Sequence, residues 1–236
     1  MRDFSQIKVL AFDIFGTVVD WHSSIVQEIE IMNLAIDANQ FALDWRVGYR
    51  PAMDKVLAGE LPWTSIDDLH RMILDSLLIQ YKIDRLSEAQ IIHLNHVWHR
   101  LVPWQDSVKA LEQLKEKYII CTLSNGNIRL LVDMARHAKL PWDYIFSAEN
   151  FRAYKPSPKT YLGVAELLNI RPEQVMMVAA HHSDLEAARE CGLHTAYIKR
   201  PLEFGSSRIK DVSPCVDNDL HATDLLDLVR LLDNSF

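Results

Sequence analysis

The sequence has few cysteines, no long hydrophobic run and no excess of positive charge. Its three cysteines, Cys121, Cys191 and Cys215, are an odd number without C-x-x-C spacing, which suits small apolar residues in a reducing compartment better than a disulfide framework. No stretch approaches the roughly 18 apolar residues of a membrane span, and residues 1–7 lack the apolar run of a signal peptide. The net charge of −7 argues against nucleic acid or an anionic membrane as the main partner. We therefore expect a cytoplasmic protein with neither of these partners.

The composition is that of an ordinary globular protein. Hydrophobic residues make up 49% and charged residues 24% of the 236 residues. This length is sufficient for a substantial core and one additional subdomain. We find no internal repeat and no low-complexity segment, so repeat architectures are not expected.

Residues 8–21, KVLAFDIFGTVVDW, contain the pattern on which the functional interpretation depends. The apolar run 9–12 ends at Asp13, and Gly16 and Thr17 follow closely. A continuous apolar run predicts a strand buried on both faces, as in a parallel sheet. Side chains at the carboxyl end of such a strand face the crevice in which α/β proteins bind ligands. Asp13 is therefore a candidate functional residue, and the alternative is an aspartate that only caps a strand–turn junction.

The remaining pattern predicts an α/β protein with a Rossmann-like parallel sheet core. Residues 21–102 carry apolar residues at helical spacing without a convincing strand, whereas buried strands are expected at 118–123, 144–147, 175–180 and 195–198, with helices between them. We therefore expect a core formed by residues 1–20 and 103–236, with a helical cap, 21–102, inserted after the first strand. Pro51 is expected to kink or break the second cap helix, and 200–214 is expected to be a surface loop.

Four segments are predicted to meet at the carboxyl edge of this sheet. They are Asp13, the pair Ser124-Asn125, Lys155, and the loop 179–184. In sequence order they read D-x-F-G-T, L-S-N-G, Y-K-P and D-L-E-A-A-x-x-x-G. This series resembles the haloacid dehalogenase superfamily from residue 8 to about residue 200, and 21–102 lies where that superfamily carries its cap.

Two departures separate the chain from the magnesium-dependent phosphatases of that superfamily. Phe15 stands where those phosphatases have a second, proton-donating aspartate, and Ala179, Ala180 and His181 stand where they have G-D-S. Magnesium needs hard oxygen ligands in a near-octahedral array, and the obvious carboxylates that remain are too few. We therefore expect no metal and no cofactor, and phosphatase chemistry is disfavoured.

With an aromatic residue at position 15, the chain resembles the type II 2-haloacid dehalogenases. The resemblance implies that Asp13 attacks C2 of a 2-haloacid, that halide leaves, and that water then hydrolyses the resulting ester. By the same resemblance Thr17 orients Asp13, and Lys155 supplies the positive charge that phosphatases obtain from metal. Asp184 would hold Lys155 and help to position the hydrolytic water.

The resemblance also implies a set of residues that bind substrate. Ser124 and Asn125 would bind the substrate carboxylate, while Phe15 and Tyr161 would line the site. The pair Trp45-Arg46 stands where the family carries an arginine that receives the halide. A guanidinium has several fixed donors and no basic lone pair, which suits this role. Arg50, one turn later, is the alternative.

The A-A-H sequence of loop 179–184 differs from the serine and asparagine usual in the family. His181, or His182 beside it, could donate a hydrogen bond to the halide instead. Some members that share A-A-H are associated with fluorinated acids. The alternatives to a dehalogenase are a phosphatase of the same fold and a catalytically silent protein that binds a small carboxylate.

Two further interpretations concern partners and metals. The only expected ligand is a small haloacid, and a homodimer is possible. His93, His96 and His99 spread over about 120° of a helix surface, so we expect a solvated face there and no metal site.

Overall fold

Six parallel strands form one sheet in the order β5-β4-β1-β6-β7-β8 in the computed structural model, which describes residues 4–234. The central strand is β1 (Val9–Phe12). Its neighbours on one side are β4 (Ile119–Ser124) and β5 (Tyr144–Ser147). On the other side lie β6 (Val175–Ala179), β7 (His194–Ile198) and β8 (Leu220–Ala222). The predicted α/β fold class is confirmed.

Strand β1 is buried on both faces, which explains its continuous apolar sequence. Leu10 and Phe12 belong to one apolar cluster, while Val9 and Ala11 belong to the cluster on the opposite face. Val9 pairs in register with residues of both β4 and β6, so β1 has a partner along each edge. Asp13 follows directly and therefore lies at the carboxyl edge of the sheet, between two neighbouring strands.

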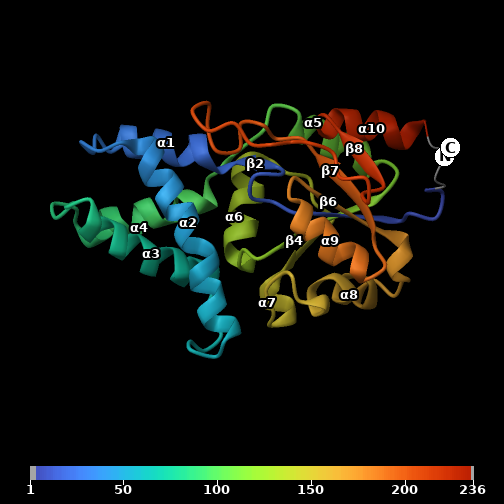
Figure 1. Cartoon of the computed structure of the whole chain (residues 1–236), viewed down its shortest axis with the longest axis horizontal. Helices are drawn as coiled ribbons and strands as arrows, with labels where there is room; N and C mark the ends of the chain where they lie inside the picture. The colour runs from blue at the N-terminus through green and yellow to red at the C-terminus, as the bar shows by residue number, and fades with distance from the viewer. Residues whose placement is uncertain (1–3, 235–236) are drawn as a thin grey trace.

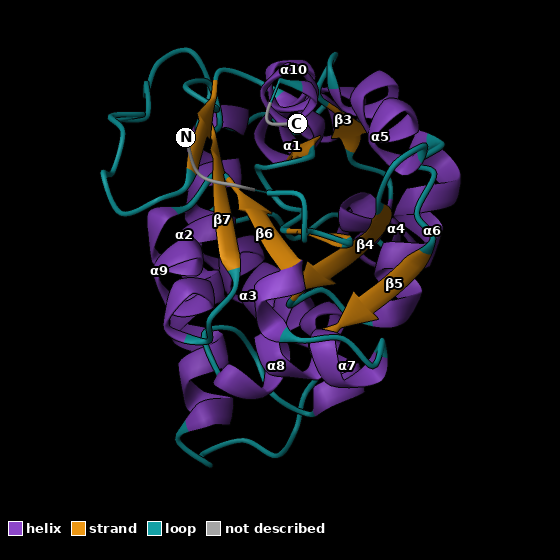
Figure 2. Cartoon of the chain, turned by 90° about the vertical axis from the view of Figure 1, so that its right-hand side faces the viewer, coloured by secondary structure: helices purple, strands orange, loops and turns teal. Residues whose placement is uncertain are grey.

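Helices cover both faces of the sheet, as Figure 2 shows. One face carries α5 (Ser107–Lys115), α6 (Ile128–Ala138) and α10 (Leu225–Asp233). The other carries α8 (Pro158–Leu167) and α9 (His182–Glu190), with the short α7 (Ala148–Phe151) beside them. A 3₁₀ turn, Pro172–Gln174, leads into β6. Parallel strands alternating with helices produce this three-layer arrangement.

The helices between residues 21 and 102 lie beside the sheet, at the left of Figure 1, and are called the helical segment below. They are α1 (Trp21–Ile31), α2 (Ala38–Leu57), α3 (Ile66–Gln80), α4 (Glu88–Asn95) and the 3₁₀ helix η1 (His96–His99). The chain enters through β2 (Val19–Asp20) and leaves through β3 (Val102–Pro103). These two short strands pair antiparallel.

Local sequence explains where these helices begin. Ser87 and Gln90 form the expected capping box at the start of α4, and the hydroxyl of Ser65 accepts the backbone N–H of Asp68 at the start of α3. Helix α2 continues through Pro51 to Leu57, so this proline does not break it. No helix of the described residues is long and apolar enough to cross a membrane.

The helical segment is joined to the sheet by apolar packing. Trp45 and Trp98 from this segment share one apolar cluster with Phe12 and Leu131 from the core. Phe15 packs edge-on against Trp98, with ring centroids 5.7 Å apart. The two parts of the chain therefore have a common interior.

A polar contact also joins the two parts, and it corrects one expectation. His99 is only 6% exposed, and its Nε2 and Nδ1 lie 2.9 and 3.1 Å from carboxylate oxygens of Asp67 in α3 and Asp133 in α6. The prediction of a solvated histidine face is therefore wrong for His99. The 3₁₀ turn of η1 directs this side chain between α3 and α6, which the helical spacing could not reveal.

The segment 200–214 also differs from the expected surface loop. Arg200 is 6% exposed and Glu203 is 0% exposed. The guanidinium of Arg200 makes two hydrogen bonds of 2.8 Å to Asp106, and its Nε donates to the backbone oxygen of Thr17 at 2.9 Å. These contacts hold the loop against the carboxyl edge of the sheet.

Only one of the three cysteines, Cys121, is buried, and all three are free thiols.

Candidate active site

A cavity of about 300 Å³ lies at the carboxyl edge of the sheet, between the core and α2. The core supplies charged and aromatic side chains to its wall, among them Asp13, Lys155 and Asp184. Helix α2 supplies the opposite wall with Arg46 and Tyr49. The cavity is small enough to suit a ligand of a few heavy atoms.

Asp13 is held by three hydrogen-bond donors. Lys155 Nζ lies 2.9 Å from Oδ1, while Thr17 Oγ1 and His181 Nδ1 lie 2.8 and 3.1 Å from Oδ2. Burial opposes ionisation of Asp13, but the ammonium of Lys155 and the ring of His181 outweigh it and hold the pKa of Asp13 well below its usual range. Asp13 is therefore a carboxylate with a fixed orientation.

Lys155 bridges the two carboxylates of the site. It lies in the turn before α8, and its Nζ is 2.5 Å from Oδ2 of Asp184 as well as close to Asp13. The backbone N–H of Lys155 donates to Oδ1 of Asn125 at 2.7 Å, which fixes the turn. Burial would lower the pKa of Lys155, but Asp13 and Asp184 raise it above its ordinary value, so the ammonium form is secured.

Asp184 has a different environment from Asp13. Its Oδ1 accepts a hydrogen bond of 2.6 Å from the hydroxyl of Tyr161 in α8, and its Oδ2 accepts from Lys155. Burial, together with the neighbouring charge of Asp13, raises the pKa of Asp184 despite the Lys155 ammonium. The site thus contains one strongly ionised carboxylate and one that is a better proton acceptor.

Helix α2 directs one free cation into the cavity. Trp45 is fully buried and donates from Nε1 to the backbone oxygen of His70, so the next residue, Arg46, is turned toward the cavity. The guanidinium carbon of Arg46 lies 4.7 Å from the ring centroid of Tyr49. Within residues 4–234, Arg46 has no carboxylate partner.

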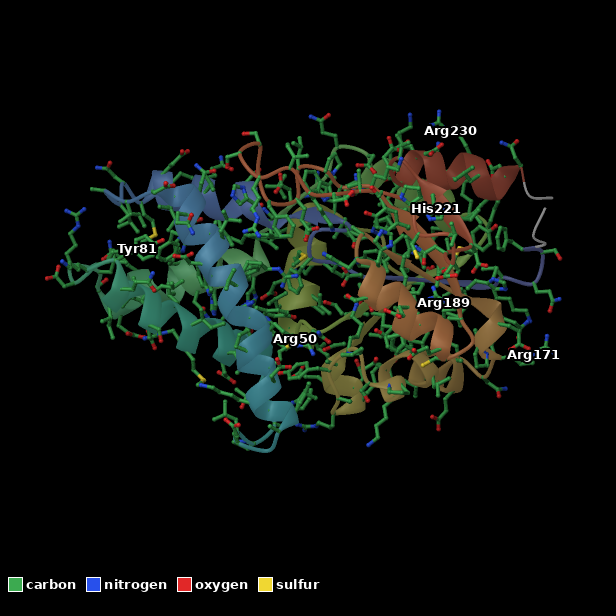
Figure 3. All side chains as sticks on the ribbon, in the orientation of Figure 1. Arg50, Tyr81, Arg171, Arg189, His221 and Arg230 are labelled. Carbon is green, nitrogen blue, oxygen red and sulfur yellow. The ribbon has the colours of Figure 1, made fainter. Side chains whose placement is uncertain are left out.

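Arg50, one turn further along α2, is placed differently. It also lines the cavity and is labelled in Figure 3, where α2 faces the core. However, its Nε lies 2.8 Å from Oδ1 of Asp54, and its side chain is 62% exposed. Its charge is therefore already paired on the surface.

His181 has two carboxylate neighbours. Its Nδ1 faces Asp13, and its Nε2 lies 2.8 Å from Oε1 of Glu203. Burial lowers the pKa of His181, but Glu203 and Asp13 outweigh this and raise it to about 9. Both ring nitrogens are therefore engaged, whereas the sequence suggested a donor free to contact halide. His182 does not take that place, because its Nε2 lies 3.0 Å from the backbone oxygen of Ser213.

Glu203 is a residue of this site that the sequence does not predict, as are Tyr49 and Met53 on the cavity wall. Its carboxylate pairs with Lys210, and His181 and Lys210 lower its pKa to about 2 against the effect of burial. The one related feature of the sequence is Gly16, which has φ of +83° and whose added Cβ would clash with Oε1 of Glu203. Nothing in segment 200–214 marks Glu203 as the residue that occupies this space.

The structure places most of the predicted site residues on the cavity wall. Those that line it are Asp13, Phe15, Arg46, Asn125, Lys155, Tyr161, His181 and Asp184. Thr17 lies beneath Asp13 and accepts the backbone N–H of Ala180 at 2.9 Å. Ser124 is 1% exposed, lies outside the cavity wall and accepts the backbone N–H of Gly126.

The donor set does not fit a magnesium ion. The ammonium of Lys155 lies between Asp13 and Asp184, at hydrogen-bond distance from both, where a phosphatase would need a cation. Ala180 offers no side-chain oxygen at the position of the phosphatase aspartate. Within the described part of the chain, no group of three or more histidine, cysteine, aspartate or glutamate residues could hold a metal ion.

Comparisons with known proteins agree with this geometry. A profile of the haloacid dehalogenase-like hydrolases matches residues 7–192. An (S)-2-haloacid dehalogenase from Burkholderia cepacia is 26% identical over 218 residues, which cover 87% of this chain and 90% of that protein. The structure of an L-2-haloacid dehalogenase is 44% identical with a TM-score of 0.91 and covers 96% of this chain and 99% of the other. That of a defluorinating L-2-haloacid dehalogenase is 41% identical with a TM-score of 0.93 and covers 99% of each chain. The chain belongs to the haloacid dehalogenase-like hydrolase family.

Proposed function

We propose that this protein hydrolyses the carbon–halogen bond of short 2-haloacids through an ester on Asp13. The observation that carries the proposal is the pairing of an ionised Asp13 with the Lys155 ammonium, beside the Arg46 guanidinium, which has no carboxylate partner among residues 4–234. A carboxylate, a fixed cation and a free cation suit the displacement of one anion by another. The names of the similar dehalogenases support the same reaction.

In the first step, a carboxylate oxygen of Asp13 attacks C2 of the haloacid. The carbon–halogen bond breaks, and its electron pair leaves with the halide, which the guanidinium of Arg46 receives. Asn125 would bind the substrate carboxylate, while Ser124, which lies outside the cavity wall, would support the loop through its hydrogen bond with Gly126. The amide nitrogen of Asn125 lies 3.4 Å from Sδ of Met53, a weak acceptor that an anion would readily replace.

In the second step, water attacks the carboxyl carbon of the ester. Asp184 would accept a proton from this water, because its pKa is raised and Lys155 and Tyr161 hold it in place. The bond between this carbon and the oxygen that is attached to C2 of the substrate then breaks, and that oxygen takes the proton from Asp184. The second water proton is released to solvent as Asp13 returns to the carboxylate.

We propose that the helical segment acts as the cap of this site. It supplies Arg46, Tyr49 and Met53 to the cavity wall, opposite the reacting carboxylate. Exclusion of water by such a wall strengthens the interaction of Arg46 with a departing halide. Fluoride, the most strongly hydrated halide, depends most on this arrangement.

The phosphatase alternative is less well supported. Phe15 carries no proton for a leaving group, and Lys155 occupies the space between the carboxylates. A silent protein that only binds a carboxylate would not need Asp13 to be ionised, oriented and placed at the cavity. Two expectations, a cytoplasmic location and a homodimer, stay predictions.

The test is halide release from chloroacetate and fluoroacetate in the presence of a chelator, run beside a phosphate-ester assay with magnesium. We expect halide release that is insensitive to chelator, and its loss in Asp13→Asn, a nearly isosteric change that leaves the circular dichroism spectrum intact. A single turnover in heavy-oxygen water should yield product that contains light oxygen from Asp13. Heavy oxygen in that first product, or activity only with magnesium, would overturn the proposal.

A further inference from the structure

A chain of three side chains, Asp13, His181 and Glu203, crosses the base of the cavity. The two nitrogens of His181 lie 3.1 Å from Oδ2 of Asp13 and 2.8 Å from Oε1 of Glu203. Ionised carboxylates only accept hydrogen bonds, so each ring nitrogen must carry a hydrogen to satisfy its neighbour. The imidazolium form of His181 is therefore the one that fits this geometry.

Glu203 is itself firmly held. It is 0% exposed, and its Oε2 pairs with Lys210, whose Nζ also donates to the backbone oxygen of Ala180 at 2.6 Å. The indole Nε1 of Trp21 lies 3.4 Å from Oε1, and the backbone of Gly16 packs directly against the carboxylate. The position of Glu203 is thus fixed by the loop, by the helical segment and by the turn after Asp13.

We propose that Glu203 is a positioning residue, which fixes His181 as a charged hydrogen-bond donor to Oδ2 of Asp13 and thereby speeds hydrolysis of the ester. This role rests on the proposed function, because it concerns the second step of that reaction. His181 touches the reacting carboxylate, whereas Glu203 acts through His181.

The two oxygens of Asp13 have unequal surroundings. Oδ1 has one donor, Lys155, and Oδ2 has two, Thr17 and His181. The less encumbered Oδ1 is the better nucleophile, so Oδ2 becomes the carbonyl oxygen of the ester. Attack by water then places negative charge on Oδ2, where the hydroxyl of Thr17 and the imidazolium of His181 are already aimed. A charged donor stabilises this oxygen more than a neutral one does.

The test is Glu203→Gln. Lys210 will attract the amide oxygen, so the amide NH₂ will face Nε2 of His181, which must then be an unprotonated acceptor. We expect ester hydrolysis to slow by about tenfold to a hundredfold. Halide release should then show a burst equal to the enzyme concentration, and intact-protein mass spectrometry should show the ester on Asp13 at steady state.

The pH profile gives a second readout. The charged and titratable groups around His181 are Asp13 with Lys155 and Asp184 on one side, and Glu203 with Lys210 on the other. Wild-type turnover should fall as the pH rises through about 9, where His181 loses its proton. In Glu203→Gln this fall should move toward the ordinary histidine pKa of about 6.5. A purely structural role would leave the midpoint unchanged.

The matched control is Asp67→Asn, the same change at another partly buried carboxylate that pairs with a histidine. Asp67 Oδ1 lies 2.9 Å from Nε2 of His99, and Asp67 neither lines the cavity nor contacts loop 200–214. This variant should lose stability without accumulating ester and without shifting the pH profile. If Glu203→Gln does not fold, Glu203→Asp keeps the charge but loses reach, and it should also accumulate ester.

A failure of the proposed function and a failure of the role of Glu203 give different results. Absence of halide release by the wild-type protein would refute the proposed function itself. Wild-type turnover together with equal slowing of both steps in the Glu203 variants would overturn the role of Glu203. An unshifted pH profile in Glu203→Gln would overturn it as well.

Discussion

Arg46 and Arg50 lie one turn apart on α2, and both line the cavity, but their charges are not equally available. Arg50 pairs with Asp54 on the surface, whereas Arg46 stacks on Tyr49 and has no carboxylate partner among residues 4–234. An unpaired guanidinium in a partly closed site attracts an anion more strongly than one whose charge is already neutralised. The position of the free cation therefore favours Arg46 as the group that receives halide.

Arg46→Ala should lower kcat for chloroacetate by roughly a hundredfold or more, because a charge-stabilising donor is lost at the departing halide. Arg50→Ala, the control on the same helix, should change kcat only slightly. Steady-state halide release from purified variants measures both. Full activity in Arg46→Ala, with loss in Arg50→Ala, would assign the halide to Arg50.

Some residues of the site can be predicted from the sequence, and others cannot. Asp13, Lys155 and Asp184 follow strands whose patterns are strong, and their meeting follows from the topology of a parallel sheet. Glu203 could not be found in this way, because it lies in a segment with no periodicity. Its place depends on contacts with His181 and Gly16, which are distant in the sequence, and with Lys210 in the same loop. The engagement of both His181 nitrogens was hidden for the same reason.

His99, in η1, joins the helical segment to α6. This side chain lies between carboxylates of Asp67 and Asp133, and Asp67 also accepts a hydrogen bond of 2.8 Å from Asn127. Burial lowers the pKa of His99, but its hydrogen bonds and charge attraction to the two aspartates outweigh burial and raise it. The imidazolium form is therefore favoured in the folded protein.

His99→Gln should lower the free energy of unfolding by about 2 kcal/mol, the value of a hydrogen bond that involves charged groups. A raised pKa means that this stabilisation is complete below the unfolded-state pKa of about 6.5 and declines as the pH rises through the folded-state value. Urea unfolding of both proteins at a series of pH values measures the difference. His93→Gln, with a side chain 59% exposed, is the control. A difference that stays constant above neutral pH would contradict this account.

The strands show which elements a sequence can predict. Five strands of the six-stranded sheet have four to six residues, and the sequence predicts all five. Strand β8 and the pair β2–β3 were not, because they have three and two residues. Such short strands are defined by their partners in space, and their own sequence carries no usable alternation.

The core and the helical segment share an apolar interior. One apolar cluster runs from Phe12 in β1 to Trp45 and Trp98 in the helical segment, and a second cluster fills the opposite face of the sheet. The polar bridge at His99 and the hydrogen bond from Tyr154 to the backbone oxygen of Thr64 join the same two parts. Separation of the helical segment from the core would expose large aromatic surfaces, which is unfavourable in water.

We therefore expect a single cooperative unfolding transition. Four of the six tryptophans lie within residues 21–102, so tryptophan fluorescence reports mainly on the helical segment, while far-ultraviolet circular dichroism reports on all helices. Urea midpoints from the two signals should coincide. A fluorescence transition at lower urea than the dichroism transition would show that the helical segment unfolds independently.

The pairing of β2 with β3 has a consequence for the engineering of new specificities. Val19 lies opposite Pro103, and Asp20 lies opposite Val102. The two connections between the core and the helical segment therefore run side by side as a pair of antiparallel strands. A replacement helical block whose two ends lie about 5 Å apart, and which covers the same apolar surface of the core, would graft onto this pair of strands without rerouting the sheet. Asp13 and Lys155 would keep their places, while a new block would bring a different wall and a different choice of substrate.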